Sequence, residues 1–276
     1  MPIPTALTIA GSDSGGGAGI QADLKAFEAN GVFGMSVLTA ITAQNTAEVT
    51  RAFELPTDLI DAQLDAVVAD LPVGAVKTGM LSSTAIIEAV AAGIARHALG
   101  PVVVDPVMVS TSGFALLAPD AVEAVRARML PLADLATPNT HEAAALAGFE
   151  VRTLEDARRA AAAILDFGPR AVLVKGGHLA SESDAVDVLL DADGERLYRA
   201  ERLDTTTTHG TGCTYASSIA ANLARGFSMR ESIARARAYL QQAIRHGLDI
   251  GAGNGPTRHF WFLSGEEAVS GGPSSG

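Results

Sequence analysis

Several features that define large classes of proteins are scarce or missing in this chain of 276 residues. It has one cysteine, which excludes an internal disulfide framework and a cysteine-based structural zinc site. No apolar run reaches the length that spans a membrane, and the first residues lack the pattern of a secretory signal peptide. We therefore predict a soluble, cytoplasmic protein.

Clusters of basic residues are missing as well. The formal net charge is −11, the isoelectric point is about 4.9, and lysine and arginine form no run. Nucleic acids and anionic membranes are bound through a basic surface, so we predict neither as a partner. A small anionic ligand stays compatible with this charge, because backbone N–H groups can hold a phosphate on an acidic protein.

The chain is rich in material for a core, with 48% hydrophobic residues and a mean hydropathy of +0.24. Short apolar runs, such as residues 6–10, 101–105 and 171–175, alternate with helical segments. This alternation predicts a mostly parallel sheet between two layers of helices, a three-layer α/β/α sandwich. A hairpin signal at residues 191–194 and two helices near the C-terminus favour this open sheet over a closed (β/α)₈ barrel.

We predict one domain over residues 1–250, followed by a C-terminal segment, residues 251–276, whose end is flexible. Within the domain, residues 11–19 contain five glycines directly after a predicted strand, although the spacing matches neither a dinucleotide fingerprint nor a P-loop. Such a loop lets the backbone approach a ligand closely. A second strand, predicted over residues 36–43, ends at Gln44, whose amide suits recognition of a heterocycle or belongs to an ordinary turn.

The stretch from Thr208 to Cys213 (THGTGC) precedes a helical run to Arg225. Its two glycines allow close backbone approach, and a helix that starts there directs free N–H groups and its positive dipole end at the loop. The pattern predicts a phosphate cradle. Cys213 falls in the first turn, where the dipole lowers a thiol pKa, so it is either a nucleophile or base, or a small buried residue.

Polar residues also follow other predicted strands. Asp105 ends one strand and fits a metal or phosphate site, a helix cap or a salt bridge. Asn139 and Glu142 are spaced as the two members of a capping box, and the same side chains suit Mg²⁺ bound through water. Lys175 reaches a phosphate or is a solvated strand end. Residues 109–117 show no period, and we interpret them as a lid.

Seven motifs in order resemble the bacterial hydroxymethylpyrimidine/phosphomethylpyrimidine kinases of the ribokinase-like superfamily, over residues 7–243. They are LTIAGSDSGGGAGIQADL near the N-terminus, AQN at 43–45, KTGML at 77–81, VVVDPVM at 102–108, TPNTHEAAAL at 137–146, LVKGGH at 173–178 and THGTGCTYASSIAANLA from 208. The resemblance implies ATP-dependent phosphorylation of an aminopyrimidine alcohol, and then of its monophosphate, for thiamine biosynthesis.

The resemblance also implies site roles. The pyrimidine would be bound by Gln44, Gly11, Ala18, Met80 and Val107; the transferring phosphoryl group by Gly210, Gly212 and the base Cys213; ATP by Lys175 and Thr211; and Mg²⁺ by Asp105, Asn139 and Glu142. Arg237 would replace an ATP-contacting lysine of some relatives. A homodimer is implied too. Two alternatives remain, a pyridoxal kinase of the same fold and a non-catalytic sensor of pyrimidines or nucleotides.

Overall fold

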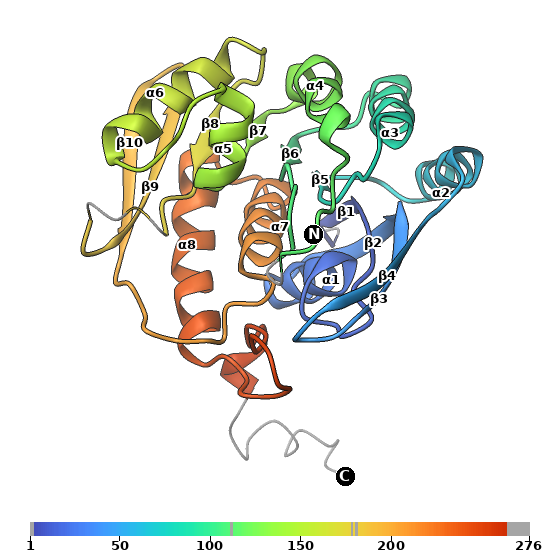
Figure 1. Cartoon of the computed structure of the whole chain (residues 1–276). Coiled ribbons are helices and arrows are strands. Elements are labelled where there is room, and N and C mark those ends of the chain that lie inside the picture. The colour runs from blue at the N-terminus through green and yellow to red at the C-terminus, as the bar shows by residue number, and fades with distance from the viewer. Residues whose placement is uncertain (1–2, 111–112, 178, 180–181, 264–276) are drawn as a thin grey trace, which may run out of the picture.

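A single eight-stranded sheet forms the middle layer of the molecule, and helices cover both of its faces (Figure 1). The computed structural model describes residues 3–110, 113–177, 179 and 182–263. The sheet strands are β1 (Thr5–Ala10), β2 (Phe33–Leu38), β5 (Val76–Thr78), β6 (Val102–Val104), β7 (Leu135–Ala136), β8 (Val172–Val174), β9 (Ala185–Asp191) and β10 (Gly194–Ala200).

The helices lie between these strands and after the last of them. They are α1 (Gly19–Ala29), α2 (Thr57–Asp70), α3 (Thr84–Arg96), α5 (Thr140–Ala147), α6 (Leu154–Leu165), α7 (Thr211–Ala224) and α8 (Met229–Arg245). Residues 119–129 form a series of short turns: a 3-10 turn (Pro119–Ala121), α4 (Val122–Ala124) and a π-helical turn (Val125–Met129). Among the described residues, no helix is long and apolar enough to cross a membrane.

The strand order is β10-β9-β8-β7-β6-β5-β1-β2. The strands from β8 to β2 run parallel, whereas β9 is antiparallel to both of its neighbours. The predicted α/β/α sandwich, with its parallel sheet and late hairpin, is confirmed.

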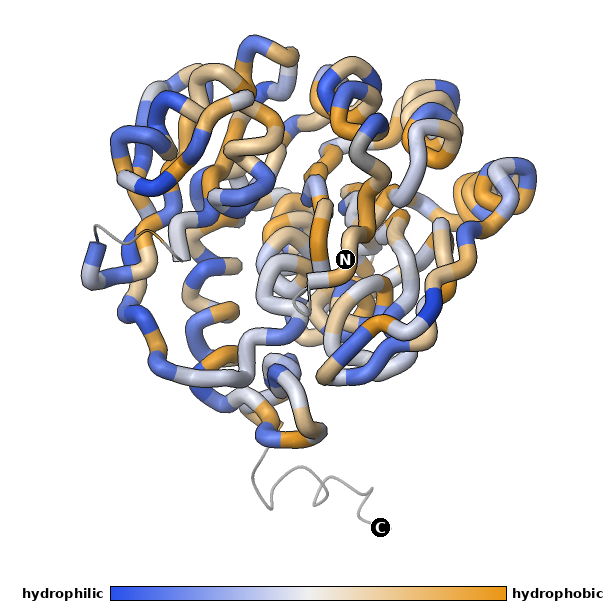
Figure 2. The backbone as a smooth tube through the Cα atoms, viewed as in Figure 1, coloured by the Kyte–Doolittle hydropathy of each residue, from blue (hydrophilic) through white to orange (hydrophobic). Residues whose placement is uncertain are grey.

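Alternate residues of the central strands enter two hydrophobic cores. In β6, Val102 and Val104 pack on the side of α2, α3, α5 and α6, and Val103 packs on the side of α1, α7 and α8. Burial of one such side chain stabilises the fold by about 1.5–3 kcal/mol. A strand with both faces covered is a nearly continuous apolar run, which is why the sequence signal was strong. Figure 2 shows that α2 is hydrophobic toward the sheet and hydrophilic outside.

The strand predicted over residues 36–43 was wrong in its extent. The chain leaves the main sheet after β2, and β3 (Ala40–Gln44) pairs instead with β4 (Val49–Glu54) in a separate two-stranded antiparallel sheet. Thr39 marks the turn: it is fully buried, and its hydroxyl donates to the Met80 carbonyl at 2.8 Å. Because β4 is exposed along almost its whole length, it lacks the apolar pattern that would have predicted it.

The C-terminal segment, residues 251–276, contacts the domain over the part that the structure describes. His209 N–H donates to the Gly255 carbonyl at 3.0 Å, and Arg258 N–H donates to the Ala243 carbonyl at 3.0 Å. Residues 255–258 therefore lie against the loop before α7 and against α8. Residues 264–276, where the predicted flexible end falls, lie outside the described residues.

Candidate active site

A cleft with about 800 Å³ of open space lies where β1, β5, β6 and β8 end. The carboxyl ends of parallel strands meet at one edge of a sheet, so residues that follow different strands come together there. Of the site residues predicted from the sequence, all but Arg237 line this cleft: Gly11, Ala18, Gln44, Met80, Asp105, Val107, Asn139, Glu142, Lys175, Gly210, Thr211, Gly212 and Cys213.

The amino-terminal end of α7 opens into the cleft. The helix begins at Thr211, and Gly210 before it adopts a left-handed conformation with φ of +78°. Gly210 has no side chain with which to cap this end, and the first turn holds no acidic residue, so the positive dipole end of the helix faces the cleft. An added Cβ at Gly212 would lie 3.4 Å from Lys175 Nζ. The helix start is therefore an anion-binding arrangement beside a lysine.

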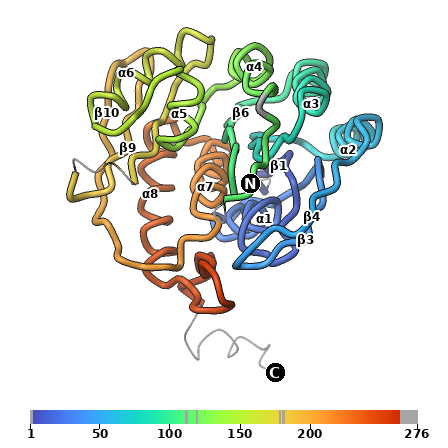
Figure 3. Tube along the Cα trace, in the orientation of Figure 1, coloured from blue at the N-terminus to red at the C-terminus, as the bar shows by residue number. Residues whose placement is uncertain are grey.

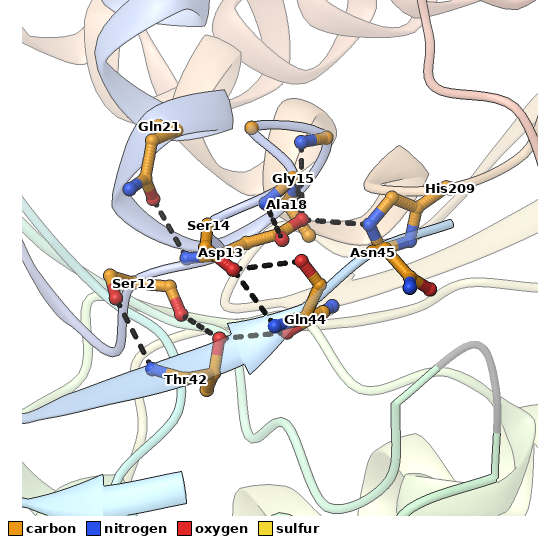
Figure 4. Close-up of polar contacts among 12 residues, drawn as sticks. Ser12, Asp13, Ser14, Gly15, Ala18, Gln21, Thr42, Gln44, Asn45 and His209 are labelled. Atoms are coloured by element: carbon orange, nitrogen blue, oxygen red, sulfur yellow. Dashed lines mark hydrogen bonds and ion pairs between the residues drawn. The ribbon is translucent and has the colours of Figure 1, made fainter. Parts of the chain in front are cut away.

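Asp13 joins the glycine-rich loop to the loop before α7, and sequence reasoning missed it. Its carboxylate accepts from the N–H groups of Gly15 (2.8 Å), Gly17 (3.1 Å) and Ala18 (2.8 Å), and lies 2.8 Å from His209 Nε2 (Figure 4). Burial raises the pKa of Asp13, but the His209 contact and the N–H groups outweigh it and hold the pKa below its usual value. The buried carboxylate thus holds two ligand-facing loops together.

Asp105, Lys175 and Glu142 form a charged cluster. Lys175 Nζ lies 2.6 Å from Asp105 Oδ1. Burial lowers the pKa of Lys175, but the two carboxylates outweigh it, so its pKa is raised and the ammonium stays charged. Burial raises the pKa of Glu142 to about 7; Lys175 opposes this shift and Asp105 adds to it. The two carboxylates of Asp105 and Glu142 share the single positive charge of Lys175, so the cluster can accept a second cation such as a metal ion.

The predicted capping box is present. Asn139 Oδ1 accepts from the N–H groups of His141 and Glu142, both at 2.9 Å, and Glu142 Oε2 accepts from Asn139 N–H at 2.7 Å. The Asn139 oxygen is therefore engaged by the helix. Among the described residues, no group of three or more His, Cys, Asp and Glu could hold a metal ion. Mg²⁺ rarely needs one, since it is commonly bound by one or two carboxylates, water and substrate phosphates, and Asp105 and Glu142 fit that pattern.

Gln44 lies at the end of β3, across the cleft from α7. Its backbone is held by Ser14, whose hydroxyl donates to the Gln44 carbonyl (2.7 Å) and accepts from its N–H (2.8 Å) (Figure 4). The Thr42 hydroxyl donates to Gln44 Oε1 at 3.1 Å. Among the described residues, the two N–H donors of this side-chain amide have no hydrogen-bond partner, so these donors and one acceptor lone pair are available to a ligand.

The Cys213 thiol differs from the sequence expectation. The dipole of α7 was predicted to lower its pKa, yet burial raises the pKa of this thiol to about 11. Lys77 opposes the shift, while Asp23 and Asp105 add to it. The thiol is therefore protonated at neutral pH. The prediction was wrong because it counted the helix end and not the depth at which the side chain lies.

Arg237 and the predicted lid, residues 109–117, differ in their relation to the cleft. Arg237 is not among the residues that line the cleft; its Nε lies 3.5 Å from Asp187 Oδ2 on β9. Of the predicted lid, residues 111 and 112 lie outside the described residues, whereas Val109, Ser110 and Leu116 line the cleft. The lid therefore stays a prediction. Lys77 also lines the cleft and was missed as a site residue.

The geometry agrees with comparisons to known proteins. The profile of the family described as phosphomethylpyrimidine kinase matches residues 13–258. The chain belongs to this family. A Streptomyces coelicolor hydroxymethylpyrimidine/phosphomethylpyrimidine kinase is 55% identical over 260 residues, which cover 94% of this chain and 96% of that protein. The resemblance drawn from the seven motifs is confirmed.

Solved structures extend the comparison to the fold. Bacillus subtilis pyridoxal kinase, solved as an ADP complex, is 40% identical with a TM-score of 0.89, and the match covers 96% of this chain and all of that one. A phosphomethylpyrimidine kinase from Clostridium difficile is 44% identical with a TM-score of 0.78, covering 88% of this chain and all of that one. The phosphomethylpyrimidine kinase family thus shares its ribokinase-like architecture with pyridoxal kinases.

Proposed function

We propose that this chain uses ATP to phosphorylate the hydroxymethyl group of 4-amino-5-hydroxymethyl-2-methylpyrimidine, and then its monophosphate, for thiamine biosynthesis. The observation that carries the proposal is one cleft with an uncapped helix start at Gly210 to Cys213 and an amide at Gln44. The helix start would bind the phosphate anion, and the Gln44 amide would bind the edge of the heterocycle. The 55% identical relative of that name supports the choice of substrate.

The reaction needs positioning and charge stabilisation more than covalent help. The hydroxyl oxygen forms a bond to the γ-phosphorus, and the bond from that phosphorus to the ADP oxygen breaks. The N–H groups at the start of α7 and the Lys175 ammonium face the region where negative charge collects. Asp105 and Glu142 would hold Mg²⁺, which when bound neutralises phosphate charge.

At the other end of the cleft, Gln44 would recognise the aminopyrimidine. Its free N–H donors suit a ring nitrogen, and its remaining lone pair suits the amino group. Met80 Sδ would lie 3.2 Å from a Cβ added at Gly11, so the Met80 side chain closes the cleft over that glycine. Ala18 and Val107 complete a small apolar wall. A larger side chain at Gly11 would displace Met80.

Cys213 would accept the hydroxyl proton on Sγ as the new P–O bond forms. Because its thiol is protonated at neutral pH, turnover should rise about tenfold per pH unit through the neutral range, as the thiolate fraction rises. Cys213→Ala should bind ATP normally and lose most of its turnover at every pH. Unchanged turnover in that variant would place the base elsewhere.

The deciding experiment is a coupled ADP-release assay with Mg-ATP and three separate substrates: the pyrimidine alcohol, its monophosphate and pyridoxal. Turnover of both pyrimidines supports the proposal. Turnover of pyridoxal alone would move the chain to the function named for its B. subtilis structural neighbour, and no ADP release with any of the three would favour the non-catalytic sensor. The homodimer is a separate proposal that size-exclusion chromatography with light scattering tests.

A further inference from the structure

A buried ion pair lies beneath the cleft. Lys77 Nζ on β5 is 2.9 and 2.8 Å from the two carboxylate oxygens of Asp23 on α1, and both side chains are completely inaccessible to solvent. Thr8 and Ser217 each donate a hydroxyl to Asp23 at 2.6 Å. The carboxylate is therefore saturated. The ammonium has three donors, and the carboxylate uses two of them.

The pair contacts α7 at Ser217, one helical turn beyond Cys213. Cys213 and Ser217 lie one turn apart on the same face of α7, and Gly19 and Asp23 lie one turn apart on the same face of α1. These two faces meet, since Ser217 donates to Asp23. The Gly19 N–H lowers the pKa of the Cys213 thiol, which places α1 against the thiol as well. Figure 3 shows α1 and α7 side by side, although they are far apart in the sequence. Lys77 and Cys213 both line the cleft.

Stability alone does not account for this arrangement. Removing two charges from water costs several kcal/mol per ion, and hydrophobic residues of similar volume often serve a core equally well or better. Every other Lys or Arg that forms an ion pair in the described residues keeps part of its side chain accessible, and only Lys77 has none. A charge fixed at this depth beside a thiol acts through a low dielectric, where its effect is large.

We propose that Lys77 is a positioning residue of the kinase reaction: its buried ammonium, held in place by Asp23, stabilises the thiolate of Cys213. The inference rests on the proposed role of Cys213 as the base. The charged groups that face the thiol are Lys77 from β5, Asp23 from α1, Asp105 after β6 and, beyond Gly212, Lys175 after β8. Of these, Lys77 has the largest effect on the thiol, and it favours the thiolate.

The test uses the fact that Cys213 is the only cysteine. Thiolate formation is followed by ultraviolet absorbance from about pH 7 to about pH 12. This range covers the rising part of the titration of a thiol whose pKa is about 11. The signal of the same variant carrying Cys213→Ser is subtracted. The midpoint is the pH at which half of Cys213 is thiolate. In Lys77→Met this midpoint should move to higher pH, with on the order of tenfold less thiolate at a given pH. In Asp23→Asn, which keeps the ammonium and removes the opposing charge, it should move down.

The double variant Lys77→Met/Asp23→Asn is the control for folding, because it leaves no unpaired buried charge. Its midpoint should lie between those of wild type and Lys77→Met. Loosened packing would admit water and lower the midpoint in all three variants. An unchanged or lowered midpoint in both variants that lack Lys77 would overturn the inference.

Turnover is measured on the same proteins with Mg-ATP and the pyrimidine alcohol. It should fall in Lys77→Met at neutral pH and recover as the pH is raised, with little change in KM. If the midpoints shift as expected but Cys213→Ala keeps its turnover, the electrostatic inference stands and the proposed base fails. The two claims therefore fail separately.

Discussion

Gly210 offers the sharpest test of the anion-binding loop. Its φ of +78° is a conformation in which an alanine costs about 1 kcal/mol. An added Cβ would also lie 1.8 Å from the Gly17 carbonyl oxygen, whereas real contacts of this kind stay beyond 3.0 Å. In Gly210→Ala the two loops must therefore separate by about 1.2 Å.

This displacement sets the expected size of the effect. A misplacement of about 1 Å at a reacting centre costs on the order of 10²-fold in rate, so kcat of Gly210→Ala should fall about a hundredfold. The free energy of unfolding should fall by about 2–4 kcal/mol, from the backbone conformation and the displaced loop together. ADP release under saturating Mg-ATP measures the first quantity, and denaturant unfolding the second.

Gly226 is the matched control on the same helix. It follows α7 with φ of +87°, and no atom lies within 4 Å of its added Cβ. Gly226→Ala should therefore lose about 1 kcal/mol of stability and keep its kcat. Wild-type kcat in Gly210→Ala, or an equal loss of kcat in Gly226→Ala, would refute the argument from close contact.

Three further predictions concern the walls of the cleft. Asp13→Asn replaces a carboxylate that accepts three N–H groups, so the free energy of unfolding in denaturant should fall by about 2–4 kcal/mol and kcat should fall as well. Wild-type stability and kcat in this variant would mean that the two loops stay together without the carboxylate. The KM for Mg²⁺ should rise below about pH 7 as Glu142 is protonated, and Glu142→Gln should show a high KM with no such dependence. Gln44→Ala should raise the KM for the pyrimidine alcohol by about tenfold or more, and for pyridoxal by less; equal effects would argue against amide recognition.

Local patterns predicted much of this molecule. Buried strands such as residues 101–105 could be read directly, because a strand covered on both faces is a continuous apolar run. The capping box of Asn139 and Glu142 depends on residues three apart, so its prediction needed no tertiary information. The glycines at 210 and 212 located the helix start and the loop before it for the same reason.

Other features depend on contacts between distant parts of the chain. The pairing of β3 with β4 was missed because β4 is exposed and carries no apolar period. Asp13 and His209 are separated by 196 positions, and Lys77 and Asp23 by 54. No local pattern predicts which charges meet across such distances.

Sequence patterns were enough to predict the α/β/α sandwich, the family and the residues that gather at the ends of the parallel strands. The sandwich and the gathering of those residues follow from short-range periodicity and from the parallel direction of the strands, whereas the family follows from the resemblance of the seven motifs. The chemical state of those residues depends instead on the folded arrangement of the chain. Cys213 has a raised pKa because of its depth and its neighbours, and Lys77 affects it because β5, α1 and α7 meet at that point. Position in a sequence determines which groups are present, whereas burial and distance determine their charge.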